Sequence, residues 1–196
     1  MGKSASGKDT IYEHLFRDPE LKLSRIIMYT TRPIRDREYE GKEYHFVSNE
    51  RRMELERQGK IIEQRYYDTV YGRWYYFTVD DGQIDPENND YLVPGVLDSY
   101  LGMRAYFGAD KVIPIYIEVE DGERLQRAIR REKKQQVPKY EEMCRRFLSD
   151  TKDFSEENLQ KAGIGTRFDN TGALDDCMEK IRAYIQAAGE EGAVDS

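Results

Sequence analysis

The chain has 196 residues, 35% of them charged and 38% hydrophobic, and its formal net charge is −7. This length suits one domain with a hydrophobic core, and the negative charge disfavours a general nucleic-acid binder, whose affinity comes from cations on phosphates. We find no apolar run of about 20 residues that could span a bilayer and no secretory leader. The two cysteines, Cys144 and Cys177, are too few for a disulfide framework and form no zinc motif with the two histidines, so we expect a reducing, cytoplasmic setting.

The first part of the chain alternates between helix and strand patterns. Residues 9–16 have the apolar spacing of a helix, and the β-rich runs 24–32 and 44–48 predict strands. Ser48 is a suitable N-cap for the helix that follows, and Gly59 is a suitable end for it.

The rest of the chain continues this alternation. The aromatic stretch 60–79 predicts two or three short strands with a turn near Gly72, and the apolar runs 91–97 and 111–119 are typical of strands buried in a parallel sheet. Helices that alternate with such strands indicate an α/β core, with the aromatic stretch in a smaller accessory region. We expect further helices at residues 99–107, 121–134, 138–153 and 173–188.

The opening stretch "MGKSASGKDT" contains a phosphate-binding motif, because Gly2, Gly7 and Lys8 match the spacing G-x-x-x-x-G-K. In such a loop, backbone N–H groups surround phosphate oxygens, the following helix presents its positive end, and the lysine adds a charge near the outer phosphates. Asp9 stands where a Mg²⁺-binding hydroxyl is usual, so we expect Thr10 to take that role. Similar short stretches also occur in disordered termini, and the motif alone leaves that alternative open.

A second motif lies in "TTRPIRDREYEGKEYHFVS", at residues 30–48. Arg32 and Arg35 are three residues apart, and Tyr44 follows nine residues later. Two guanidinium groups and a phenol can together cover the oxygens of a monophosphate, although a charge-rich run is also typical of a solvated loop.

The spacing of this second motif resembles the signature of guanylate kinases: T-T-R, two residues, R, two residues, E, two residues, G, two residues, Y. The matching residues are Thr30, Thr31, Arg32, Arg35, Glu38, Gly41 and Tyr44. The resemblance implies a P-loop NTPase fold of the α/β class, in which helices flank a parallel sheet that carries a small β-rich GMP-binding insert and a helical lid. It also implies the reaction ATP + GMP → ADP + GDP, with Mg²⁺ bound together with ATP, and we expect neither nucleic acid nor membrane as a partner.

On this resemblance the chain is one domain of residues 1–196. Its core comprises residues 1–30, 84–122 and 163–190, its nucleoside-monophosphate-binding region residues 31–83, and its lid residues 123–162. A phosphate loop normally follows a β-strand, and this strand is missing before Gly2, so we expect Met1 to be an internal methionine of a longer protein.

The resemblance gives roles to individual residues of the acceptor site. Arg32, Arg35 and Tyr44 would hold the GMP phosphate, and Glu63 would accept hydrogen bonds from guanine N1 and N2. A carboxylate at that position suits guanine and disfavours adenine, because an unpaired buried polar group is costly. The remaining GMP-binding candidates are Tyr75 near the phosphate, Thr78 near the base, and Asp98.

On the ATP side, the resemblance implies catalysis by Lys8 and by lid arginines, which neutralise charge on the transferred phosphoryl group. The best matches among those arginines are Arg127, Arg131 and Arg146, and Asn170 would approach the adenine. The loop residues expected to bind ATP are Gly2, Lys3, Ser4, Ala5, Ser6, Gly7, Lys8, Asp9 and Thr10.

Two further departures from the family pattern leave the acceptor open. Pro94 and Gly95 stand where an aspartate ends the corresponding strand, with Asp98 about three residues late, and Tyr76 replaces a glycine in a segment that is longer than usual. The alternatives are a related small-molecule kinase such as a ribose-bisphosphate kinase, a non-enzymatic guanylate-kinase-like binding module and, last, nucleic-acid binding through the aromatic stretch. The sequence does not give the oligomeric state.

Overall fold

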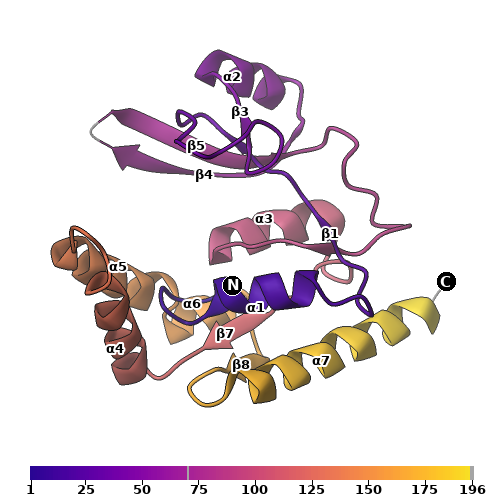
Figure 1. Cartoon of the computed structure of the whole chain (residues 1–196). Helices are drawn as coiled ribbons and strands as arrows, with labels where there is room; N and C mark the ends of the chain where they lie inside the picture. The colour runs from indigo at the N-terminus through magenta and orange to yellow at the C-terminus, as the bar shows by residue number, and fades with distance from the viewer. Residues whose placement is uncertain (70, 195–196) are drawn as a thin grey trace. The chain divides into compact units, whose positions relative to one another are not determined.

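The structure is a computed structural model that describes residues 1–69 and 71–194 (Figure 1). The chain forms two compact units. The first, the loop unit, comprises Met1–Lys22, Pro94–Leu97 and Ile113–Ser196, and the second, the hairpin unit, comprises Leu23–Val93 and Asp98–Val112. Each unit therefore combines segments that are distant in the sequence.

Two parallel strands lie in the loop unit, β7 (Tyr116–Glu118) and β8 (Arg167–Asp169), with Ile117 opposite Phe168. The Met1 carbonyl accepts a hydrogen bond from the Ile117 N–H (2.9 Å), so the first residue lies alongside β7. The helices of this unit are α1 (Lys8–Phe16), α4 (Asp121–Glu132), α5 (Tyr140–Asp153), α6 (Glu156–Lys161) and α7 (Leu174–Val194). Its buried apolar side chains include Ile11, Leu15, Tyr116, Ile117, Phe168 and Ile181.

Helix α4 shows how local side chains set an element boundary in this unit. The Glu120 carboxylate accepts hydrogen bonds from the N–H groups of Gly122 and Glu123, both at 2.9 Å, and so caps the helix. Acidic residues in the first turn and arginines in the last turn complement the helix dipole. The helix predicted over 121–134 is confirmed.

A four-stranded sheet lies at the centre of the hairpin unit, in the order β3 (His45–Phe46), β2 (Tyr29–Thr30), β5 (Gly72–Val79) and β4 (Ile61–Thr69). β4 and β5 form a long antiparallel hairpin, whereas β2 and β3 are parallel. A separate parallel pair joins β1 (Ser24–Arg25) to β6 (Tyr91–Leu92). The helices are α2 (Asn49–Arg57) and α3 (Leu97–Phe107), which belongs to this unit from its second residue onward.

Helix α2 covers one face of the hairpin and packs its buried Leu55 against β5. Its ends lie where the sequence predicts them. The Ser48 hydroxyl accepts a hydrogen bond from the Arg51 N–H (3.2 Å), and Gly59 follows the last turn at φ +67°. The Lys60 N–H then donates to the Leu55 carbonyl (3.0 Å), which satisfies a carbonyl that the helix leaves open.

Three of the predicted strands differ from expectation. The run 24–32 is not one strand, because β1 pairs with β6 whereas β2 belongs to the four-stranded sheet. Proline shortens the apolar runs 91–97 and 111–119, since Pro94 and Pro114 have no N–H to contribute to a ladder. β6 therefore ends before the first proline, and β7 begins after the second.

The aromatic stretch 60–79 forms two long strands rather than several short ones, and they meet near Gly72 at φ +101°. All of the expected helices are present, and α6 is an additional helix that the sequence pattern does not predict. The mixed α/β class with parallel strand pairs is confirmed. The division into core, monophosphate-binding region and lid stays a prediction. Within the described part of the chain, no helix is both long enough and apolar enough to cross a membrane.

Candidate functional site

The phosphate-loop motif closes tightly on its neighbours at both glycines. A side chain at Gly2 would place its Cβ 2.6 Å from the Ile117 carbonyl oxygen. Gly7 has φ +84°, in the left-handed region, and its Cβ would lie 2.5 Å from the Asn170 amide nitrogen. Only glycine fits either position without a shift of the surroundings.

Two side chains from distant parts of the loop unit hold this loop. The Asn170 amide, which is buried, donates a hydrogen bond to the Ser6 carbonyl (2.8 Å). The Asp150 carboxylate on α5 accepts one from the Ser4 N–H (2.7 Å). Asn170, expected near the adenine, therefore fastens the loop in this structure, and the contact with Asp150 was not predicted.

The residues after the loop begin α1. The Lys8 ammonium lies 3.6 Å from the Asp9 carboxylate and is partly exposed. Thr10, the predicted Mg²⁺ ligand, is exposed on the first turn of the helix together with Asp9. The described residues contain no group of three or more His, Cys, Asp and Glu side chains that could hold a metal by themselves.

Two arginines of α4 are bound into the fold. Arg124 is 1% exposed and contacts the carboxylates of Asp121 (3.1 Å) and Asp150 (3.4 Å). Arg127 forms an ion pair with Glu123 (2.9 Å) and donates to the Asn170 carbonyl (2.9 Å). Arg127, a predicted catalytic residue, thus contacts the end of β8 in this structure.

The other two predicted lid arginines line one cavity. Arg131 of α4 and Arg146 of α5 border a space of about 320 Å³ that also touches Ser4 of the loop. Both side chains are exposed, and the Arg146 guanidinium pairs with Glu142 (3.2 Å). The structure therefore brings two expected catalytic arginines together beside the phosphate-loop motif.

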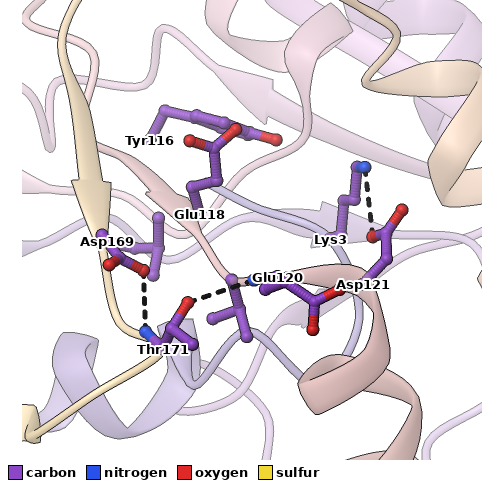
Figure 2. A pocket seen from close by; sticks show the side chains of 9 residues that line it. Lys3, Tyr116, Glu118, Glu120, Asp121, Asp169 and Thr171 are labelled. Carbon is purple, nitrogen blue, oxygen red and sulfur yellow. Dashed lines mark hydrogen bonds and ion pairs between the residues drawn. The ribbon is translucent and has the colours of Figure 1, made fainter.

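A second cavity of about 410 Å³, shown in Figure 2, has an acidic wall and lies beside β7 and β8. Asp121 pairs with Lys3 (3.5 Å), and Asp169 accepts a hydrogen bond from the Thr171 N–H (2.8 Å). The hydrogen bonds from Thr171 lower the pKa of Asp169. Because Glu118 and Glu120 lie in the same wall, the cavity is a poor site for phosphate groups.

In the hairpin unit, strand alternation separates two faces of β4 and β5. Glu63 lies opposite Thr78 and Arg65 opposite Tyr76, so these four side chains share one face, which we call the pocket face. Tyr75 lies on the other face, where the Arg52 guanidinium stacks 4.1 Å from its ring centre. Tyr75, expected near the phosphate, is therefore not on the pocket face, and Tyr76 is.

The Glu63 carboxylate is buried on the pocket face. Its Oε1 accepts a hydrogen bond from the Thr78 hydroxyl (2.8 Å), whereas its buried Oε2 has no hydrogen-bond donor among the described residues. The Arg65 guanidinium lies 3.5 Å from that Oε2. Helix α3 comes close because Gly102 has no side chain, and a Cβ there would lie 2.5 Å from the Glu63 Cβ.

A partly buried ion pair lies next to the pocket face. Arg32, 4% exposed, binds Glu38 through two hydrogen bonds of 2.6 and 2.7 Å, and this guanidinium holds the pKa of Glu38 at about 2. The Arg32 guanidinium stacks 5.2 Å from the ring centre of Tyr44, which packs against Tyr76 at 5.7 Å. Burial raises the pKa of Tyr44.

The guanylate kinase family model matches residues 1–92. A guanylate kinase of Porphyromonas gingivalis is 32% identical over 116 residues, which are 58% of this chain and 60% of that protein. One of Listeria monocytogenes is 38% identical over 66 residues, 34% of this chain and 32% of that protein.

Over residues 1–92 the chain is similar to the guanylate kinase family. A crystal structure of guanylate kinase from Anaplasma phagocytophilum aligns with a TM-score of 0.58 at 21% identity, covering 95% of this chain and 82% of that one. This likeness confirms the predicted P-loop NTPase fold. The chain spans 60% of the Porphyromonas relative and about a third of the Listeria relative.

Set against the guanylate kinase signature, the hairpin unit brings Arg32, Tyr44, Glu63 and Thr78 into one neighbourhood. Arg35 is exposed and contributes its backbone N–H to Glu38 (2.9 Å), and Asp98 is exposed in the first turn of α3. Sequence reasoning missed Arg65 and its partner on α3. The period of two along β4 was the available signal, because it places residues 63 and 65 on the same face.

Proposed function

We propose that the protein is a guanylate kinase, which transfers the γ-phosphoryl group of ATP to GMP and yields ADP and GDP. The observation that carries this proposal is the buried Glu63 carboxylate, whose Oε2 has no hydrogen-bond donor within the described residues. Guanine presents two adjacent donors, N1–H and the N2 amine, whereas adenine presents no such pair on this edge. A site built around that carboxylate discriminates strongly, because the wrong base leaves it unpaired.

The acceptor phosphate would be held by Arg32, Arg35 and Tyr44. The guanidinium of Arg32 is oriented in advance by Glu38, and Arg35 is exposed and can reach a ligand. Guanidinium groups suit a phosphate because their N–H donors match two oxygens at once. The Tyr44 phenol stays neutral, since burial raises its pKa, and it can therefore donate a hydrogen bond.

The phosphoryl donor would be ATP on the phosphate loop. The loop amides and Lys8 would bind the phosphates, and Arg131 and Arg146 would neutralise charge as the group is transferred. The open cavity between these arginines and Ser4 supports this role. Mg²⁺ would be held mainly by the ATP phosphates, with the Thr10 hydroxyl as the protein ligand, and would neutralise phosphate charge.

Free cysteines support a reducing, cytoplasmic setting as part of the proposal, because both Cys144 and Cys177 are unpaired. We propose ATP and GMP as the partners and no nucleic acid.

The decisive experiment is a coupled ADP-release assay with ATP and Mg²⁺. GMP, dGMP, AMP, CMP, UMP and ribose bisphosphate would be compared as acceptors. We expect GMP and dGMP to be phosphorylated far faster than the others. Turnover of GMP no faster than of CMP or UMP would contradict the proposal.

A ribose-bisphosphate kinase is the second candidate, motivated by the departures from the family pattern at Gly95 and Tyr76. Such an acceptor has no base, so it would leave Glu63 unused. In the same assay, turnover of ribose bisphosphate alone would favour this candidate. Tight GMP binding without any ADP release would instead favour a non-enzymatic binding module.

A further inference from the structure

Arg65 is the one charged side chain of the pocket face that neither the motif spacing nor the family signature assigns. It lies on β4 two residues after Glu63, and its side chain is 15% exposed. Its Nη1 donates a short hydrogen bond to the hydroxyl of Ser99 on α3 (2.6 Å). The buried Ser99 thus fixes the guanidinium from the side of the helix.

The same guanidinium is also fixed from the sheet. Nη1 lies 3.5 Å from the Glu63 Oε2, beyond a good hydrogen bond but close enough for an ion pair. The Tyr76 ring centre lies 5.7 Å from the guanidinium carbon. Contacts from α3, β4 and β5 therefore hold this partly buried arginine side chain in one conformation.

The donors of Arg65 exceed its partners. A guanidinium carries five N–H donors, and the hydrogen bond to Ser99 uses one of those on Nη1. No hydrogen bond from Nε or Nη2 to any described residue is present. The pocket face therefore offers a donor group directly beside a carboxylate oxygen that has no hydrogen-bond donor of its own.

This pairing of groups matches the edge of a 6-oxopurine. Guanine presents, in order, the O6 acceptor, the N1–H donor and the N2 amine donor. An arginine next to a glutamate presents a donor followed by acceptors. Adenine has an N6 amine at the first position and an N1 acceptor at the second, so its amine would meet the arginine donors and N1 would meet the carboxylate.

We propose that Arg65 determines specificity by donating a hydrogen bond to O6 of the acceptor purine, while Glu63 accepts from N1 and N2. This inference rests on the proposed function and narrows the acceptors of that site to 6-oxopurine nucleoside monophosphates. Arg65 recognises the oxygen at position 6, and Glu63 recognises the donors next to it.

A purely structural role for Arg65, as the partner of Glu63 and Ser99, makes a different prediction. Loss of a structural contact weakens the site for every acceptor by a similar factor. Loss of a contact to O6 weakens the site only for acceptors that have a good hydrogen-bond acceptor at position 6. The two roles are therefore separated by substrate preference and not by total activity.

The test compares GMP with 6-thioguanosine 5′-monophosphate, in which a sulfur, a weak acceptor, replaces O6 and both donors remain. kcat/KM is measured for both acceptors with the wild type, Arg65→Met and Arg65→Lys. We expect Arg65→Met to lower kcat/KM for GMP by about 10- to 100-fold and that for the thio acceptor much less. The ratio of kcat/KM for GMP to kcat/KM for the thio acceptor should then fall toward one in Arg65→Met. Arg65→Lys, which keeps a cationic donor, should restore part of this ratio.

Arg73→Met on β5 is the matched control, because the Arg73 guanidinium pairs with the exposed Asp68 (2.8 Å) at the far end of the hairpin. It should leave both rates unchanged. An equal loss on both acceptors in the Arg65 variants would overturn the inference while leaving the proposed function standing. Failure of the wild type to bind GMP by calorimetry would overturn both.

Discussion

In the hairpin unit Arg32 and Glu63 of the candidate site are buried and paired, whereas in the loop unit Arg131 and Arg146, which line a cavity with Ser4, are exposed on helices. Arg32 and Glu63 are 4% and 7% exposed, and each has a fixed neighbour from the sheet or the loop beside it. Arg131 and Arg146 line an open cavity instead. In the loop unit the buried polar side chain of Asn170 binds the backbone of the phosphate loop instead.

Under the proposed function, the difference follows from what each region would recognise. A base is distinguished by its pattern of donors and acceptors, and a pattern can be matched only by groups that are fixed and shielded from water. A phosphate chain needs charge and backbone N–H groups, and long arginine side chains can supply the charge while they remain mobile. On that proposal, burial in the hairpin unit would serve selectivity, and exposure in the loop unit would serve charge neutralisation.

The contrast depends most on Glu63. Replacing Glu63 by Gln keeps the shape and an acceptor for Thr78 but puts an amide nitrogen where Oε2 was. We expect kcat/KM for GMP to fall by about a thousandfold, measured by ADP release. Glu54→Gln, on the exposed side of α2 where Glu54 pairs with Arg51, is the control. A loss below tenfold would mean that the buried carboxylate does not select the base.

Lys8 tests the other half of the contrast. Lys8→Met removes the charge near the outer phosphates, and we expect kcat to fall by about 10²- to 10³-fold with little change in thermal stability, because the side chain is partly exposed. Lys161→Met, which breaks an exposed pair with Glu157 on α6, should keep full activity. An unchanged kcat in the Lys8 variant would show that the phosphate-loop motif takes no part in the reaction.

Gly7→Ala asks whether the backbone of the loop is as fixed as the structure indicates. The left-handed φ and the approach of Asn170 at 2.5 Å both oppose a Cβ, so we expect the free energy of unfolding to fall by about 1–3 kcal/mol and KM for ATP to rise. Gly165→Ala, where a Cβ would meet nothing within 4 Å, is the control. Equal urea midpoints for the two variants would show that the loop backbone accommodates a Cβ at Gly7 with little loss of stability.

The smallest expected effect concerns pH. Because the pKa of Glu38 is lowered from 4.5 to about 2 by Arg32, the pair stabilises the fold fully above pH 4.5 and loses this contribution as the pH falls toward 2. Glu38→Gln should therefore lower the unfolding free energy by about 1 kcal/mol at pH 7. The difference from the wild type should shrink between pH 4.5 and 3 in urea titrations. If the difference in unfolding free energy did not change with pH, the ionised Glu38 would not be the source of the stabilisation.

Short-range features could be predicted from the sequence because neighbouring residues set them. Ser48 and Gly59 bound α2 through contacts within a few residues, and the spacing of Gly2 and Gly7 indicates the loop directly. The groups that hold this loop could not be predicted in the same way. The Asn170 and Asp150 contacts join residues 164 and 146 positions apart, and local patterns carry no information about such partners.

The placement of Tyr75 and Tyr76 follows from the strand period. Thr78 and Tyr76 are two residues apart on β5 and share the pocket face, whereas Tyr75 is three residues from Thr78 and lies on the other face. The sequence shows which residues are aromatic, but the period gives the face of each one only once these residues are assigned to one regular strand.

The contact between Asp150 and the Ser4 N–H means that the phosphate loop already holds an anion of its own. A phosphate that takes this amide has to displace a carboxylate tethered to the same molecule. A tethered competitor acts at a high effective concentration and cannot be diluted away. Under the proposed function, the affinity for ATP would therefore be a net quantity, set by the loop and by the cost of breaking the Asp150 contact. If Asp150 left that position, Arg124 would also lose one of its two carboxylate partners.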